Sequence, residues 1–185
     1  MFLGDSLAAG YGVDPEEAFP ALVGERIRDR GWPFRVVNAG VSGDTSAGGL
    51  RRLDWLLRQR IDILVLELGA NDALRGLPLD VTERNLEAIV EKARAAAPDM
   101  VIVLAGMLAP PNLGLDYSER FRSIFPRLSE RHGLHLVPFL LEGVGGRAEL
   151  NLSDGIHPTP EGHQLVAENV WQVLEGVLAD QVTRR

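Results

Sequence analysis

A serine near the start of the chain and a histidine near its end are the residues best suited to do chemistry. Ser6 stands in the segment Gly4–Leu7, and His157 closes the segment Asp154–His157. A serine hydroxyl is a poor nucleophile at neutral pH, so it needs a base to take its proton and a third group to orient that base. Asp154, three residues before His157, can reach the Nδ1–H of the same imidazole from one loop. The pattern predicts Ser6 as nucleophile, His157 as base and Asp154 as the orienting carboxylate.

Two segments in the middle of the chain offer donors for a developing oxyanion. Gly43 and Asn71 both follow apolar, strand-like runs. A glycine lets a backbone N–H approach a tetrahedral intermediate closely, and an asparagine amide donates without losing a proton. The backbone N–H of Ser6 would be a third donor, at the start of a helix. Taken singly, Gly43 could be an ordinary turn glycine and Asn71 could form an Asx turn.

Four blocks of the sequence, in this order, resemble the SGNH or GDSL hydrolase family. Gly4–Leu7 matches the nucleophile block, Gly43 the glycine block, Asn71 the asparagine block, and Asp154 with His157 the final block. The resemblance implies a flavodoxin-like three-layer α/β/α fold and acyl transfer through the residues named above. We expect neither a cofactor nor a metal ion.

One branch of that family is especially similar, namely the bacterial multifunctional thioesterase, lysophospholipase and arylesterase branch. The segment Pro110–Gly114 with Tyr117 and Phe121 carries that resemblance, as does Leu136–Phe139. Leu113 departs from the pattern, because an aromatic residue is expected there. The resemblance implies a small-molecule acyl ester or thioester as substrate, in an acyl groove whose shape Leu113 alters.

Two stretches rich in glycine and proline, 75–80 and 107–116, are candidate walls of the substrate pocket. Both follow the end of a strand, and ligands of open parallel sheets bind outside the carboxyl ends of the strands. We expect these stretches to contact the acyl chain and to be more mobile than the sheet. The substrate-binding candidates are apolar: Leu74, Leu77, Leu79, Leu108, Pro110 and Leu113.

Apolar runs alternate with helical patterns along the chain, which predicts a parallel α/β sheet. We expect five strands in the order 2-1-3-4-5, at residues 1–3, 34–38, 61–68, 100–105 and 134–138. We expect the main helices at residues 18–30, 46–58, 81–96, 117–131 and 160–178. The last helix is marked by Thr159 as its cap and by an apolar stripe at 3.6-residue spacing.

Composition narrows the class of protein. A chain of 185 residues suits a single domain, 1–185, with a substantial core. A net charge of −7 argues against nucleic acid or an anionic membrane surface as the main partner. There is no cysteine, and no apolar run long enough to span a membrane. The numbered chain shows no signal-peptide pattern, which leaves a cytoplasmic protein or a mature periplasmic or secreted form. The oligomeric state stays open.

Other polar residues receive less reactive interpretations. Asp5 and Asp72 are predicted to fix loops by accepting backbone N–H groups. His163 is expected at the surface or an interface, and His132 and His135 in solvent. A metal site built on Asp154, His157 and His163 would lack further ligands. The segment 10–12 lacks the third glycine of a dinucleotide loop, so no nucleotide cofactor is expected.

The sequence therefore predicts a serine esterase that hydrolyses carboxylic esters, with acyl-thioesters or lysophospholipids as further candidates. A carbohydrate O-acetylesterase would use the same four blocks, but it calls for polar or aromatic sugar platforms where this chain offers leucines and prolines. A catalytically inactive binding module on the same fold is the alternative outside enzymes, since a fold does not determine a function.

Overall fold

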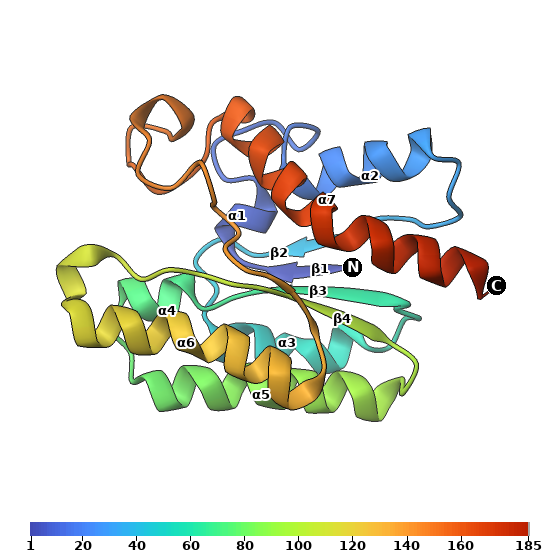
Figure 1. The fold of residues 1–185 in the computed structure, drawn as a ribbon, viewed down its shortest axis with the longest axis horizontal. Helices are drawn as coiled ribbons and strands as arrows, with labels where there is room; N and C mark the ends of the chain where they lie inside the picture. The colour runs from blue at the N-terminus through green and yellow to red at the C-terminus, as the bar shows by residue number, and fades with distance from the viewer. Residues whose placement is uncertain (185) are drawn as a thin grey trace.

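A single parallel sheet of five strands organises the computed structural model, which describes residues 1–184 without the side chain of Pro111 (Figure 1). The strand order is β2-β1-β3-β4-β5, as the sequence predicts. The strands are β1 (Phe2–Gly4), β2 (Asn38–Gly40), β3 (Ile63–Glu67), β4 (Val101–Ala105) and β5 (His135–Val137). Every residue of β3 is buried, as expected of a parallel strand covered on both faces.

Helices cover both faces of the sheet, which gives three layers (Figure 1). Helices α2 (Phe19–Asp29) and α7 (Pro160–Thr183) pack on one face, and α3 (Ser46–Leu56), α5 (Leu79–Ala96) and α6 (Leu115–His132) lie on the other. Short helices α1 (Ser6–Ala9) and α4 (Ala70–Leu74) follow β1 and β3, and 3₁₀ turns occupy Pro111–Leu113 and Ala148–Leu150. The α/β/α architecture is confirmed. Among the described helices, none is both long and apolar enough to cross a bilayer.

The second strand lies further along the chain than predicted. The apolar run suggested residues 34–38, but the ladder with β1 pairs Phe2 with Asn38 and Gly4 with Gly40. Strand β1 has only three residues, so its parallel partner can form only a ladder of that length. The apolar residues before Asn38 lead into the sheet instead of lengthening it.

Helix α7 corrects the expectation for His163. Thr159 caps this helix by accepting the N–H of Gly162 at 3.2 Å, as predicted. His163 is buried, and its Nδ1 accepts the backbone N–H of Phe19 at 3.3 Å. Burial, and then the charge of His157, lowers the pKa of His163 to about 4. The ring is therefore a neutral part of the packing between α2 and α7.

The carboxyl ends of β1, β2 and β3 meet at one edge of the sheet. Ser6 begins α1 directly after β1, Gly43 follows β2, and Asn71 lies in α4 just after β3. The three predicted oxyanion donors thus come from three neighbouring strand ends. Helix α4 was not predicted, because five residues are too few for a periodic pattern.

Candidate active site

Ser6, His157 and Asp154 form a continuous chain of hydrogen-bond contacts. His157 Nε2 lies 2.9 Å from Ser6 Oγ, and His157 Nδ1 lies 2.7 Å from Asp154 Oδ2. A neutral ring that keeps its proton on Nδ1 for Asp154 leaves Nε2 free to accept the serine proton. The structure therefore brings together the three residues that the sequence singled out, across 151 positions of the chain.

The loop that carries Asp154 and His157 is held by its own carboxylate. Asp154 Oδ1 accepts the backbone N–H groups of Ile156 at 2.9 Å and His157 at 3.0 Å, while Oδ2 faces the ring. The ring contact, followed by the two N–H donors, lowers the pKa of Asp154 to about 2. Asp154 is thus ionised at neutral pH, as an imidazole-orienting carboxylate must be.

The three predicted oxyanion donors line the same cleft as Ser6 Oγ. Within residues 1–184, the backbone N–H groups of Ser6 and Gly43 donate to no protein acceptor. Asn71 Nδ2 donates one hydrogen to Asp5 Oδ2 at 3.0 Å, and an amide nitrogen carries two. Its second hydrogen remains available for a ligand. Gly43 has a φ of +80°, so its backbone conformation, as well as close approach, favours glycine.

Asp5 fixes the turn that presents Ser6, as predicted. Its Oδ1 accepts the N–H of Leu7 at 2.9 Å and caps α1. Beneath that turn lies Glu67, a buried carboxyl that the sequence reading missed. Its Oε2 accepts the N–H groups of Asp5 at 3.0 Å and Ala8 at 3.2 Å, on either side of Ser6. A Cβ on Gly4 would lie 2.3 Å from this oxygen, so the glycine of the first block makes room for Glu67.

The buried carboxyl groups of Asp5 and Glu67 differ in their protonation. Burial raises the pKa of Asp5 to about 6, with the Leu7 N–H and the Asn71 amide acting in the opposite direction. Burial and then the Asp5 charge raise the pKa of Glu67 well above its usual range. Burial acts on both groups, but the neighbouring charge raises only the pKa of Glu67, so Asp5 carries the charge and Glu67 keeps its proton.

Asp72 also fixes a loop, as predicted. Its carboxylate accepts the backbone N–H of Ser46 at 2.8 Å, the Ser46 hydroxyl, and the Thr82 hydroxyl at 3.2 Å. Ser46 follows the glycine block, whereas Asp72 follows Asn71. The contact therefore joins the second and third blocks.

The cleft beside Ser6 has a volume of about 790 Å³. Three of the six predicted substrate-binding residues line it, namely Leu74, Leu108 and Pro110. Leu77, Leu79 and Leu113 are not among its lining residues. Leu79 is buried in the core, because α5 begins at this residue and turns it inward. These three positions correct the sequence prediction of the pocket wall.

Several residues of the cleft escaped the sequence analysis. The Tyr11 ring lies against the His157 ring, with centroids 4.4 Å apart. The partial likeness of segment 10–12 to a dinucleotide loop does not predict this contact. Met107 and Ala109 also line the cleft, within the predicted stretch 107–116. The other unpredicted lining is largely apolar: Leu7, Ala70, Phe139, Leu141 and Ile156. No group of three or more potential metal ligands occurs in the part of the chain that the structure describes.

A serine, a histidine and an aspartate that contact one another in that order, at the carboxyl edge of a parallel sheet, define an α/β serine hydrolase. Comparison with known proteins identifies the family. The model of the GDSL-like lipase/acylhydrolase family matches residues 2–165. The chain belongs to this family, which confirms the resemblance seen in its four blocks.

Individual relatives are similar over nearly the whole chain. The esterase TesA of Pseudomonas aeruginosa is 41% identical over 96% of this chain and 88% of its own length. Thioesterase 1/protease 1/lysophospholipase L1 of Escherichia coli is 38% identical over 91% of this chain and 79% of its own. The psychrotrophic esterase EstA of Pseudoalteromonas sp., solved with monoethylphosphonate as inhibitor, is 36% identical. That match has a TM-score of 0.90 and covers 96% of this chain and 97% of the other.

Proposed function

We propose that the protein is a serine esterase that hydrolyses carboxylic esters through an acyl-enzyme on Ser6, acting as a single domain over 1–185. The observation that carries the proposal is the contact chain from Asp154 through His157 to Ser6, which opens into an apolar cleft. The names of the relatives, an esterase and a thioesterase/lysophospholipase, support the same class of reaction.

The reaction proceeds in two steps. Ser6 Oγ attacks the ester carbonyl while His157 Nε2 takes the hydroxyl proton, and the bond to the leaving alcohol breaks as His157 returns that proton to it. Water then attacks the acyl-enzyme, again with His157 as base, and releases the acid and Ser6. In both steps the carbonyl oxygen becomes an oxyanion, which the N–H groups of Ser6 and Gly43 and the Asn71 amide stabilise.

The lining of the cleft favours an acyl chain over a sugar. Leu74, Leu108, Met107 and Ile156 offer apolar surface, and few polar groups other than the catalytic ones face the cleft. A carbohydrate would leave its hydroxyls without partners there. The proposed substrate is therefore a small-molecule ester with an apolar acyl group. An acyl-thioester or a lysophospholipid fits the same lining.

Hydrolysis of p-nitrophenyl butyrate by the wild type, Ser6→Ala and Ser123→Ala tests this function. Ser123 is a half-buried serine of α6 outside the lining of the cleft, and it serves as the control. Loss of Ser6 should lower kcat by about 10⁴- to 10⁶-fold. A p-nitrophenyl phosphonate should add one phosphonyl group to the wild type and to Ser123→Ala, but none to Ser6→Ala. A folded Ser6→Ala variant with a tenth of the wild-type rate, or a wild type without turnover, would refute the proposal.

A further inference from the structure

The oxyanion donors stand on three separate strand ends, so something must hold these ends in register. A displacement of about 1 Å can lower the rate of an enzyme by about 10²-fold. Two of the three pairs of blocks have cross-links described above. Asn71 donates to Asp5, which joins the third block to the first, and Ser46 donates to Asp72, which joins the second to the third.

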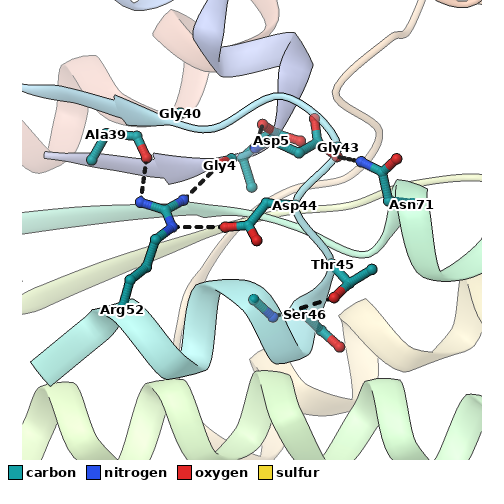
Figure 2. Close-up of polar contacts among 12 residues, drawn as sticks. Gly4, Asp5, Ala39, Gly40, Gly43, Asp44, Thr45, Ser46, Arg52 and Asn71 are labelled. Carbon is teal, nitrogen blue, oxygen red and sulfur yellow. Dashed lines mark hydrogen bonds and ion pairs between the residues drawn. The ribbon is translucent and has the colours of Figure 1, made fainter.

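Between the first and second blocks, the backbone N–H of Val41 donates to the carbonyl of Gly4 at 3.0 Å, and Arg52 of α3 adds a side-chain cross-link (Figure 2). Its Nη2 donates to the carbonyl of Gly4 at 2.8 Å, and its Nη1 donates to the carbonyl of Ala39 at 2.6 Å. Its Nε donates to Asp44 Oδ2 at 2.7 Å. One planar guanidinium thus ties the end of β1, the end of β2 and the loop after Gly43 to a single helix.

The positions of the three acceptors connect Arg52 to the chemistry. Gly4 lies two residues before Ser6, and Asp44 directly follows Gly43. The contacts are partly shielded from water, since the side chains of Arg52 and Asp44 are 22% and 13% exposed. Charge-assisted hydrogen bonds in such surroundings hold geometry better than a solvated surface pair does.

We propose that Arg52 is a positioning residue that sets the Gly43 N–H against the Ser6 nucleophile. It contacts backbone carbonyls and a loop carboxylate, and it does not line the cleft. Its effect therefore falls on the alignment of donors and not on substrate contacts. The inference rests on the proposed esterase function, because it concerns the oxyanion that this reaction forms.

Lysine cannot replace arginine in this role. A guanidinium directs several donors in one plane, whereas an ammonium is a single point charge. An ammonium placed at Asp44 would remove the guanidinium donors of the Gly4 and Ala39 carbonyls, and only the backbone hydrogen bond from Val41 to Gly4 would still join the two blocks at this point. Arg52→Lys should consequently keep the charge and most of the fold while it loses part of the alignment.

The test compares Arg52→Met and Arg52→Lys with Arg26→Met as the matched control. Arg26 is a partly buried arginine of α2 that pairs with Glu168 of α7, on the opposite face of the sheet. For p-nitrophenyl butyrate, kcat should fall by about 10- to 100-fold in Arg52→Met, with KM within about threefold of the wild type. Arg52→Lys should lie between Arg52→Met and the wild type, and Arg26→Met should keep the wild-type kcat.

Thermal unfolding of each variant separates alignment from stability. If Arg52→Met does not fold, Arg52→Lys decides. A folded Arg52→Lys with kcat within about twofold of the wild type would overturn the proposal, because an ammonium cannot span three acceptors. A rise in KM alone, or an equal loss of kcat in Arg26→Met, would overturn it as well. Ser6→Ala, measured alongside, tests the esterase function itself and so distinguishes the failure of one from the failure of the other.

Discussion

The Asn71 amide is a proposed oxyanion donor and also donates to the buried Asp5 carboxylate. Its replacement should therefore have two separable effects. Asn71→Ala removes one oxyanion donor, which should lower kcat by about 10²- to 10³-fold with little change in KM. It also leaves Asp5 Oδ2 without the amide that now lies 3.0 Å away. Asp5 is fully buried, so this loss should cost about 1–3 kcal/mol of the free energy of unfolding.

The stability effect should depend on pH, with a sign that follows from Asp5. Burial raises the pKa of Asp5 to about 6 in the folded protein, against an ordinary value of about 4. The associated stability is fully present below the ordinary value and is lost as pH rises through about 6. Without the Asn71 amide the ionised form has one donor fewer, so the pKa of Asp5 should rise further. The stability gap between Asn71→Ala and the wild type should therefore widen from pH 5 to pH 8.

Asn169→Ala is the matched control for this prediction. The Asn169 amide of α7 donates to the carbonyls of Leu140 and Glu142, on either side of the lining residue Leu141, and contacts none of the three oxyanion donors. Its removal should lower stability without a selective loss of kcat. Steady-state kinetics on p-nitrophenyl butyrate and urea unfolding at pH 5 and pH 8 give both readouts. The reasoning fails if Asn71→Ala keeps kcat within about fivefold of Asn169→Ala, or if its only kinetic change is a higher KM.

Two further predictions concern the buried Glu67 and the apolar lining of the cleft. In the wild type, the free energy of unfolding should fall as pH rises above 5, because the folded protein keeps a proton on Glu67 that the unfolded chain releases. Glu67→Gln should make this fall less steep, by up to about 1.4 kcal/mol per pH unit. Urea unfolding from pH 5 to pH 8 checks this, and parallel curves for the variant and the wild type would contradict it. Activity should rise by up to about fourfold in kcat/KM for each CH₂ added to the acyl chain until the cleft is full, from about 0.8 kcal/mol per buried CH₂. Leu108→Ala should shift the preferred chain length in a series of p-nitrophenyl esters, whereas Leu77→Ala, outside the lining, should not; identical profiles for both variants would place the acyl group elsewhere.

The strand order and the main helices could be predicted because hydrophobic periodicity records which faces are buried. His163 shows that more was available in the same pattern. It lies three residues before Val166, on the stripe that continues through Val170 and Leu174, and all four are buried. The polarity of the histidine suggests a surface position, whereas its place on the apolar stripe predicts burial.

The proposed catalytic residues could be predicted for a different reason from the residues that support them. Reactive side chains are restricted in type, so Ser6, His157 and Asp154 leave a signature in the sequence. The wall residues are common leucines, and whether Leu77 or Leu108 faces the cleft depends on where a loop ends and a helix begins. Glu67 left one signal, since a carboxylate within a strand covered on both faces needs buried donors.

Arg52 left no comparable signal, because two of its three acceptors are backbone carbonyls, which every residue carries. Its role emerges only from the arrangement of the strand ends. The arrangement of the strand ends also gives a function to the residues that accompany the reactive ones in the first three blocks. Asp5 follows Gly4, Asp44 follows Gly43 and Asp72 follows Asn71, and each of these carboxylates accepts a hydrogen bond that holds a strand end. The neighbours of the reactive groups therefore fix the distances between blocks, and a transition state that needs three donors at once depends on those distances.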